Sequence, residues 1–228
     1  ILSDFADGTI AFRDNDDIVR FLQIRDLLRD DALFDLTLPF ISMPEPYVSH
    51  YSRIVDLPYY LIGKALAPLL GLEQALLVAT WVWPLAMLAA FCGLTLHVLR
   101  RLVPGRLGWQ EALLTALAMT PAILEFAPGR IDHHNFQILL MLVVFSGLLG
   151  RPRAGGIVMG AATAVSIAIG LETLPYVVAA LGGVALAAVF GFAGARIRLQ
   201  AAGLSLAVFA APAAALSFGP DIVWQTQC

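Results

Sequence analysis

Residues 74–99 read QALLVATWVWPLAMLAAFCGLTLHVL and contain no Asp, Glu, Lys or Arg. Glu73 stands directly before this run, and Arg100 stands directly after it. A helix needs about 20 apolar residues to cross the hydrocarbon core of a bilayer, because it rises only about 1.5 Å per residue. The run therefore predicts a transmembrane helix, and this prediction decides the fold class.

The composition of the whole chain points the same way. Of the 228 residues, 59% are apolar or aromatic and 14% are charged, whereas a soluble domain is about half apolar and about a quarter charged. This composition excludes a disordered tail and a nucleic-acid binder. The two cysteines are Cys92, in an apolar run, and Cys228, at the last position, so a disulfide-stapled secreted domain is excluded as well.

Four more apolar runs follow the first, at residues 107–127, 135–150, 154–195 and 199–220. The run 154–195 is about twice as long as a bilayer requires. Its one charged residue is Glu172, and the Gly and Pro residues around it predict a turn that folds the run into two spans. We therefore expect an all-α, polytopic membrane protein with six spans.

Three parts follow from this pattern. Residues 1–56 are expected to form an acidic external loop that contains an amphipathic helix. Residues 57–72 are expected to form a re-entrant or interfacial helix, and residues 73–228 the six-span domain. The chain begins without Met, so we expect it to be the N-terminal part of a longer protein, with a further span before residue 1.

Arginines fall on alternate connections between the expected spans. One set of connections holds Arg100, Arg101, Arg106, Arg151, Arg153, Arg196 and Arg198. The other set holds Arg130 with Asp132, His133 and His134, then Glu172, then Asp221. Arginine-rich connections are retained in the cytoplasm. The acidic loop and the histidines are therefore expected on the periplasmic face of a bacterial inner membrane.

The first candidate functional segment is RDNDDIVR, residues 13–20. The residues that recur with helical spacing from this segment onward are Ile18, Phe21, Leu22, Arg25 and Leu28. This spacing predicts an amphipathic helix on the outer surface. Asp14, Asp16 and Asp17 would lie near its start, where the helix dipole favours carboxylates. They either cap the helix as solvated acids or hold a divalent cation.

The second candidate segment is GRIDHHN, residues 129–135, which interrupts the apolar body with polar residues. Carboxylate and imidazole are both metal ligands, so Asp132, His133 and His134 are candidate ligands. A polar loop cap is the alternative. Glu172 is the third candidate, because an ionisable group between two spans indicates a functional site, with a hydrated turn as the alternative.

Three arginines, Arg20, Arg53 and Arg130, are candidates to bind a phosphate group. For Arg53, a salt bridge with Asp56 is an equal alternative. The candidate acids all map to the face opposite the arginine-rich connections. Carboxylates that converge over a membrane-embedded cavity suit metal-assisted chemistry on a lipid-phosphate substrate.

These segments resemble motifs of the GT-C class of membrane glycosyltransferases, most closely those of the catalytic subunit of oligosaccharyltransferases. In that family the first external loop has an Asp followed six residues later by an Arg, as Asp14 and Arg20 are here. The second external loop carries a motif like SGxYDxD or GSYDNE, which residues 129–134 resemble with Asp132 on the first acid. His134 stands in place of the second acid, as in bacterial variants with a GRIDHHN motif. The acceptor motif WWD is absent.

The resemblance implies a glycosyltransferase that takes a sugar or oligosaccharide from a polyprenyl-(di)phosphate donor. It implies a divalent metal, Mg²⁺ or Mn²⁺ with Zn²⁺ as a further candidate. The resemblance implies that the motif acids Asp14 and Asp132 bind this metal. Together with the residue chemistry above, the expected metal ligands are Asp14, Asp132, His133, His134 and Glu172. The expected catalytic acids are Asp14, Asp16 and Asp17, and the expected substrate-binding residues are Arg20, Arg53 and Arg130. The expected partners are the donor and membrane lipids, without nucleic acid.

Two rival hypotheses remain. A transporter could use the same acids as an ion pathway, and inverted repeats would favour that hypothesis. A non-catalytic membrane subunit could keep the GT-C scaffold and bind another membrane complex.

Overall fold

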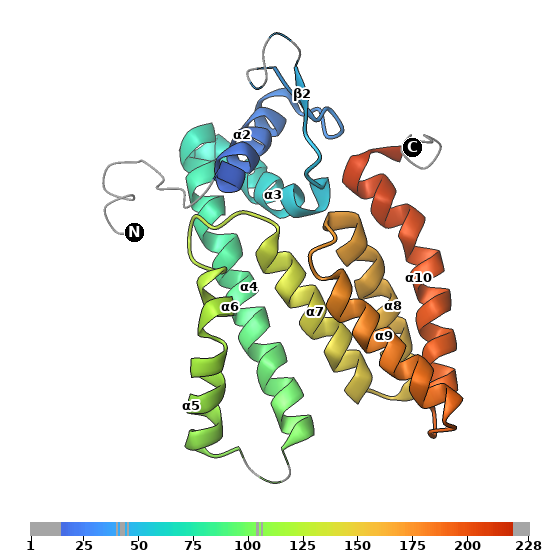
Figure 1. Ribbon diagram of the computed structural model, residues 1–228. Coiled ribbons are helices and arrows are strands. Elements are labelled where there is room, and N and C mark those ends of the chain that lie inside the picture. Colours follow the sequence, from blue (N-terminus) through green and yellow to red (C-terminus); the bar gives the residue numbers. More distant parts are fainter. Residues whose placement is uncertain are drawn as a thin grey trace.

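The computed structural model describes residues 15–39, 41, 44, 46–103, 105 and 107–220 (Figure 1). The helices are α2 (Asn15–Asp30), α3 (Arg53–Leu70), α4 (Leu72–Leu102), α5 (Trp109–Ala118), α6 (Thr120–Leu124), α7 (His134–Leu149), α8 (Pro152–Ile169), α9 (Leu174–Val189) and α10 (Ala195–Phe218). The strands β1 (Thr37–Leu38) and β2 (Tyr47–Val48) form one short antiparallel pair. The all-α class is therefore confirmed, with this strand pair as an addition. Asp14, Arg106, Asp221 and Cys228 lie outside the described residues.

Three of the described helices, α4, α8 and α10, are long and apolar enough to cross a membrane. The apolar helices α7 and α9 have 16 residues each, which is short of the about 20 residues that a full crossing requires. Within the described residues, three helices therefore reach the length of a full crossing, and the six spans expected from the sequence stay a prediction. The turn expected around Glu172 is confirmed, since α8 ends at Ile169 and α9 begins at Leu174.

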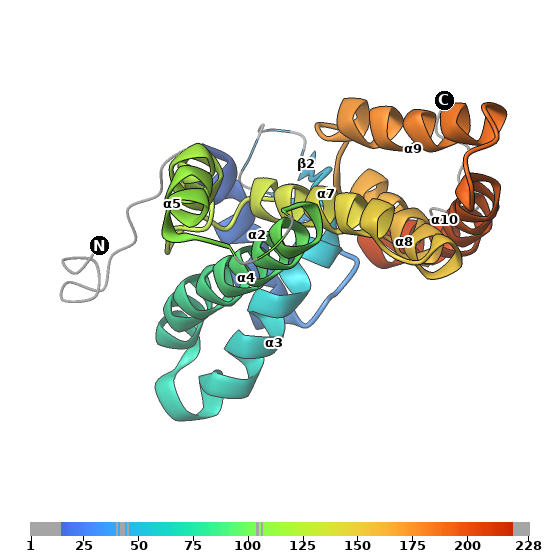
Figure 2. The ribbon, with the colours of Figure 1, turned by 90° about the horizontal axis from the view of Figure 1, so that it is seen from below.

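The apolar run 107–127 does not form a single helix. Helix α5 ends at Ala118, α6 begins at Thr120, and Pro121 lies in the first turn of α6. Proline has no backbone N–H with which to continue a preceding helix, so it favours a break followed by a new start. Neither helix contains a buried residue, and both lie at one edge of the molecule (Figures 1 and 2).

The connections between the helices gather at two ends of the molecule (Figure 1). We call the end with the α4–α5, α7–α8 and α9–α10 connections the lower end. The upper end carries α2 and the α6–α7 and α8–α9 connections. The described arginines of the first set, Arg100, Arg101, Arg151, Arg153, Arg196 and Arg198, belong to the lower end. The grouping of these loops on one face is therefore as the sequence predicts.

Helix α3 lies across the upper end of the long helices (Figures 1 and 2). Ser52 caps its start, because the Ser52 hydroxyl accepts a hydrogen bond from the backbone N–H of Ile54. The helix therefore begins at Arg53, a few residues before the expected start at 57. Gly71 separates α3 from α4 with φ 79°, a backbone conformation that glycine adopts without strain.

Helix α2 is present, but it buries a different face from the expected one. The residues that it buries are Asp17, Arg20, Gln23, Ile24 and Leu27. Ile18, which the apolar stripe would place inside, is 42% exposed. Polar side chains can occupy the buried face because charged and hydrogen-bonding partners meet them there. The helix therefore joins the rest of the protein partly through ion pairs.

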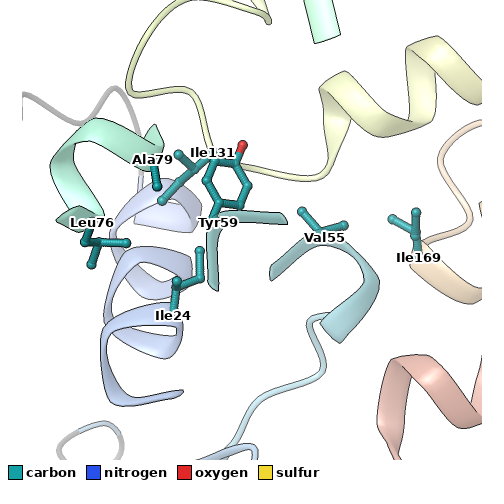
Figure 3. Packing of buried hydrophobic residues seen from close by; sticks show 7 residues of the cluster. All are labelled: Ile24, Val55, Tyr59, Leu76, Ala79, Ile131 and Ile169. Atoms are coloured by element: carbon teal, nitrogen blue, oxygen red, sulfur yellow. The ribbon is translucent and has the colours of Figure 1, made fainter. Parts of the chain in front are cut away.

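A compact apolar cluster fixes α2 to the upper end (Figure 3). Its buried members are Ile24, Val55, Tyr59, Leu76, Ala79, Ile131 and Ile169. These side chains come from α2, α3, α4, the α6–α7 connection and the end of α8. Because the Ile131 side chain is buried in this cluster, the backbone at the next residue, Asp132, is held in place.

A candidate metal centre at the upper end

The connection that carries the candidate ligands is held by Asp17 of α2. The carboxylate oxygen Oδ1 of Asp17 accepts hydrogen bonds from the backbone N–H groups of Ile131 and Asp132, at 2.9 and 3.0 Å. Its Oδ2 accepts a hydrogen bond from Arg130 Nη1 at 2.9 Å. Asp17 is fully buried. It therefore anchors the connection and presents no open face to a substrate, unlike the catalytic acid that the sequence predicts.

Three candidate ligand side chains converge directly after this anchor. His133 Nδ1 lies 2.5 Å from Asp132 Oδ1, and His134 Nδ1 contacts Asp132 Oδ2. One potential ligand atom from each residue lies within 4.8 Å of the other two. Atoms that bind one divalent ion at about 2.0–2.2 Å are at most about 4.4 Å apart. Small side-chain rotations would therefore let the three residues share an ion.

Glu172 reaches the same cluster from the α8–α9 connection. Its Oε1 lies 2.9 Å from His133 Nε2. The sequence predicts Glu172 as a metal ligand, whereas the structure places it against the nitrogen of His133 that faces away from Asp132. A carboxylate in this position orients an imidazole ligand and raises its basicity. Glu172 therefore fits the role of a positioning residue for His133.

The α8–α9 connection is held in turn by Gln137, which sequence reasoning missed. Gln137 Oε1 accepts hydrogen bonds from Ser166 Oγ and Thr173 Oγ1, each at 2.6 Å. Its Nε2 donates to the backbone carbonyl of Gly170 at 3.0 Å. The sequence feature that could have identified Gln137 is its amide side chain within the apolar run 135–150, because a buried amide needs hydrogen-bond partners.

The charges of the cluster reinforce one another. Burial acts to raise the pKa of the Asp132 carboxyl, but hydrogen bonds with His133 and His134 bring this pKa below its ordinary value. Burial acts to lower the pKa of His133, but the carboxylates of Asp132 and Glu172 raise it above its ordinary value. Arg20 Nε lies 3.9 Å from Asp132 Oδ1. Without a metal, the arrangement favours a carboxylate beside an imidazolium.

The three arginines predicted to bind phosphate are buried and paired with acids. Arg20 Nη1 donates to Asp56 Oδ1 at 2.9 Å, and Arg53 Nη1 donates to Asp56 Oδ2 at 3.1 Å. Both arginines are 1% exposed. The salt-bridge alternative for Arg53 is therefore the one that the structure shows. Arg130, 8% exposed, pairs with Asp17.

A row of rings continues from the cluster through Tyr51 to His50. The rings of His133 and Tyr51 are 6.2 Å apart, and those of Tyr51 and His50 are 4.6 Å apart. The guanidinium of Arg20 lies 4.6 Å from the Tyr51 ring centroid. The Tyr51 hydroxyl donates to Asp16 Oδ1 at 2.7 Å. Asp16, predicted as a catalytic acid, therefore lies at the side of the candidate centre.

A cavity of about 1020 Å³ opens at the His50 end of this row. Ser49 and His50 contribute polar atoms to its lining, together with Asp35 and Thr37 near β1. Its other wall is apolar and comes from α8 and α10, through residues such as Ala164, Ile167, Leu206, Ala210 and Ala214. The cavity thus combines a polar rim with an apolar wall between two candidate spans, an arrangement that suits an amphipathic ligand.

The donor set favours particular metals. One carboxylate and two imidazoles suit Mn²⁺ or Zn²⁺, whereas Mg²⁺ prefers oxygen ligands. Among the described residues, the group that could hold an ion is Asp132, His133 and His134. Comparison of the chain with protein-family models, with curated proteins and with solved structures gave no match.

Proposed function

We propose that this protein is a membrane glycosyltransferase of the GT-C type. In this proposal it transfers a sugar or oligosaccharide from a polyprenyl-(di)phosphate donor to an acceptor. The observation that carries the proposal is the convergence of Asp132, His133 and His134 at one end of apolar helices, on a connection anchored by Asp17. Such a site at the membrane surface suits the phosphate group of a lipid-linked substrate.

Each residue near the centre has a role in this proposal. Asp132, His133 and His134 would hold a divalent metal, which supplies charge neutralisation for a leaving phosphate. Glu172 would orient the His133 ring. Asp16 would orient or deprotonate the acceptor hydroxyl, since the Asp17 carboxylate is occupied by three hydrogen bonds.

The cavity between α8, α10 and the β1–β2 segment supports a lipid-linked donor. Its apolar wall can take an isoprenoid chain, and its polar rim includes His50. The His50–Tyr51–His133 row joins that rim to the candidate centre. A donor with its chain in the cavity would therefore bring its phosphate toward Asp132.

The distribution of arginine gives the proposed orientation. The lower end carries Arg100, Arg101, Arg151, Arg153, Arg196 and Arg198, so it is proposed to face the cytoplasm of a bacterial cell. The candidate centre would then face the periplasm. Single cysteines in place of Asp31 and Arg151, in a chain with serine at 92 and 228, test this orientation. An impermeant thiol reagent applied from the periplasm should label only position 31, and labelling of only position 151 would invert the orientation.

The enzymatic proposal is tested with full-length protein in lipid nanodiscs. Polyprenyl-phosphate and polyprenyl-diphosphate sugars are supplied with Mn²⁺ or Mg²⁺, and release of the free lipid phosphate is measured. Asp132→Asn should abolish the release, because it removes a charged candidate ligand. Asp30→Asn, at an exposed position of α2, is the matched control and should leave the release unchanged. Equal release by wild type and Asp132→Asn, or no turnover of either donor class, would contradict the proposal.

One observation favours the second candidate function, a non-catalytic membrane subunit on the same scaffold. Arg20, Arg53 and Arg130 are all engaged with carboxylates of the chain itself. A site whose buried cations are internally paired offers fewer charges to a substrate phosphate. Wild-type protein that binds metal but turns over no donor would select this candidate.

A further inference from the structure

Helices α8 and α10 pack closely because glycines of α8 face α10. A Cβ at Gly156 would lie 2.4 Å from the backbone oxygen of Arg198, and a Cβ at Gly160 would lie 2.2 Å from that of Ala202. Small residues of this kind let two helices approach within a membrane. The same packing brings the arginine-bearing starts of α8 and α10 to one place at the lower end.

A groove of about 570 Å³ runs along the outside of this helix pair. Its apolar lining includes Ile157 from α8 and Leu204, Val208 and Phe209 from α10. These four side chains are between 44% and 70% exposed. The hydroxyl of Ser205, also in the lining, already donates to the backbone carbonyl of Ile157 at 2.8 Å. The wall of the groove is therefore an exposed apolar surface.

The groove has a polar mouth at the lower end only. Arg153 in the first turn of α8 and Gln200 in the second turn of α10 belong to the lining. Arg196 precedes the lining residue Ile197. Arg153 and Arg196 are exposed, and neither forms an ion pair with any acid in the described part of the chain. The mouth is therefore a cationic site with no acidic partner among the described residues.

The length of the groove matches one leaflet of a bilayer. From Ile197 to Phe209 along α10, the helix rises about 18 Å at about 1.5 Å per residue. Half of a hydrocarbon core of about 30 Å is about 15 Å. Both walls belong to candidate spans, and only 22% of the most apolar part of α10 is buried within the protein. An aliphatic chain from one leaflet would therefore fit along the groove with its head at Arg153.

We propose that this groove is a binding site for an anionic phospholipid of the leaflet at the lower end. The phosphate and any further negative group of the lipid would lie between Arg153, Arg196 and Gln200. An acyl chain would cover Ile157 and Leu204. Basic pockets between transmembrane helices are known places for anionic head groups, and charge complementarity selects such a lipid over a zwitterionic one. The proposal does not depend on the glycosyltransferase function.

Native mass spectrometry of the full-length protein in detergent tests this site. Phosphatidylglycerol and phosphatidylcholine with the same acyl chains are titrated separately, and glycerol phosphate is titrated as a head group without chains. Wild type should bind phosphatidylglycerol several-fold more tightly than phosphatidylcholine and should not retain glycerol phosphate. Arg153→Gln should weaken phosphatidylglycerol about fivefold, which corresponds to about 1 kcal/mol for one arginine near the membrane surface.

The matched control is the double variant Arg100→Gln/Arg101→Gln. These arginines are also exposed at the lower end, but they belong to α4 and do not line the groove. The control should keep the wild-type preference for phosphatidylglycerol. The proposal is overturned if wild type shows no preference between the lipids, or if Arg153→Gln binds as wild type does. An equal loss in the control would also overturn it, because the effect would then belong to the whole cationic face.

Discussion

The anchoring of the candidate centre by Asp17 makes a quantitative prediction. Asp17→Ala removes a fully buried carboxylate that accepts hydrogen bonds from two backbone N–H groups and from Arg130. Arg130 keeps its second ion pair, with Glu125, so the main loss comes from the two buried backbone N–H groups, each of which costs about 1–3 kcal/mol when its acceptor is removed. The free energy of unfolding should therefore fall by about 2–6 kcal/mol. Asp17→Asn keeps an oxygen for the backbone donors but loses the charge opposite Arg130, so its loss should be about 1–3 kcal/mol.

The assay is denaturant-induced unfolding of the purified protein in detergent, followed by tryptophan fluorescence. Asp30→Asn is the control, because Asp30 ends the same helix at an exposed position, and it should shift stability by no more than about 0.5 kcal/mol. An Asp17→Ala protein within about 1 kcal/mol of wild type would refute the anchoring argument. So would equal losses for Asp17→Ala and Asp30→Asn.

Three further predictions follow from packing, charge and protonation. Gly160→Ala should destabilise the protein by about 1–3 kcal/mol in the same assay, because its Cβ would clash with a backbone oxygen of α10. Gly203→Ala is the control, since a Cβ at Gly203 would meet open space, and it should be neutral or slightly stabilising. Asp56→Asn should lower the unfolding free energy by about 3–5 kcal/mol, since two buried guanidinium groups share this carboxylate, and a loss below about 1 kcal/mol would speak against that network. Calorimetric titration should show that the affinity of the protein for Mn²⁺ falls as the pH decreases through the raised pKa of His133, because a protonated imidazole cannot bind a metal. An affinity for Mn²⁺ that stays constant between pH 8 and 5.5 would exclude imidazole ligands.

Several features of the fold follow from sequence because they depend on local order along the chain. The turn that carries Glu172 is indicated by Gly170 and Pro175 within an apolar run, and it lies where expected. The alternation of arginine-rich connections requires only that successive helices reverse direction. The convergence of Asp132, His133 and His134 likewise follows from adjacency, since neighbouring residues can reach a common point.

Other features depend on contacts between distant segments. Asp17 binds the backbone of residues 131 and 132, more than 110 positions away, and no local pattern encodes that pairing. The buried face of α2 was mispredicted for a related reason. Hydrophobic periodicity predicts that Ile18 is buried. The structure instead buries Arg20 and Gln23, because both side chains donate hydrogen bonds to Asp56 of α3. The hydrophobic pattern within one helix carries no information about a hydrogen-bond acceptor on another helix.

The most direct test of the candidate centre is pulsed EPR of Mn²⁺ bound to the full-length protein. Asp132, His133 and His134 are proposed to bind one ion, so wild type should hold one Mn²⁺ with nitrogen couplings from two directly bound imidazoles. His133→Ala and His134→Ala should each remove one coupling, and Asp132→Asn should release the ion. Absence of nitrogen coupling in bound Mn²⁺, or an unchanged spectrum in the two histidine variants, would contradict the proposed centre.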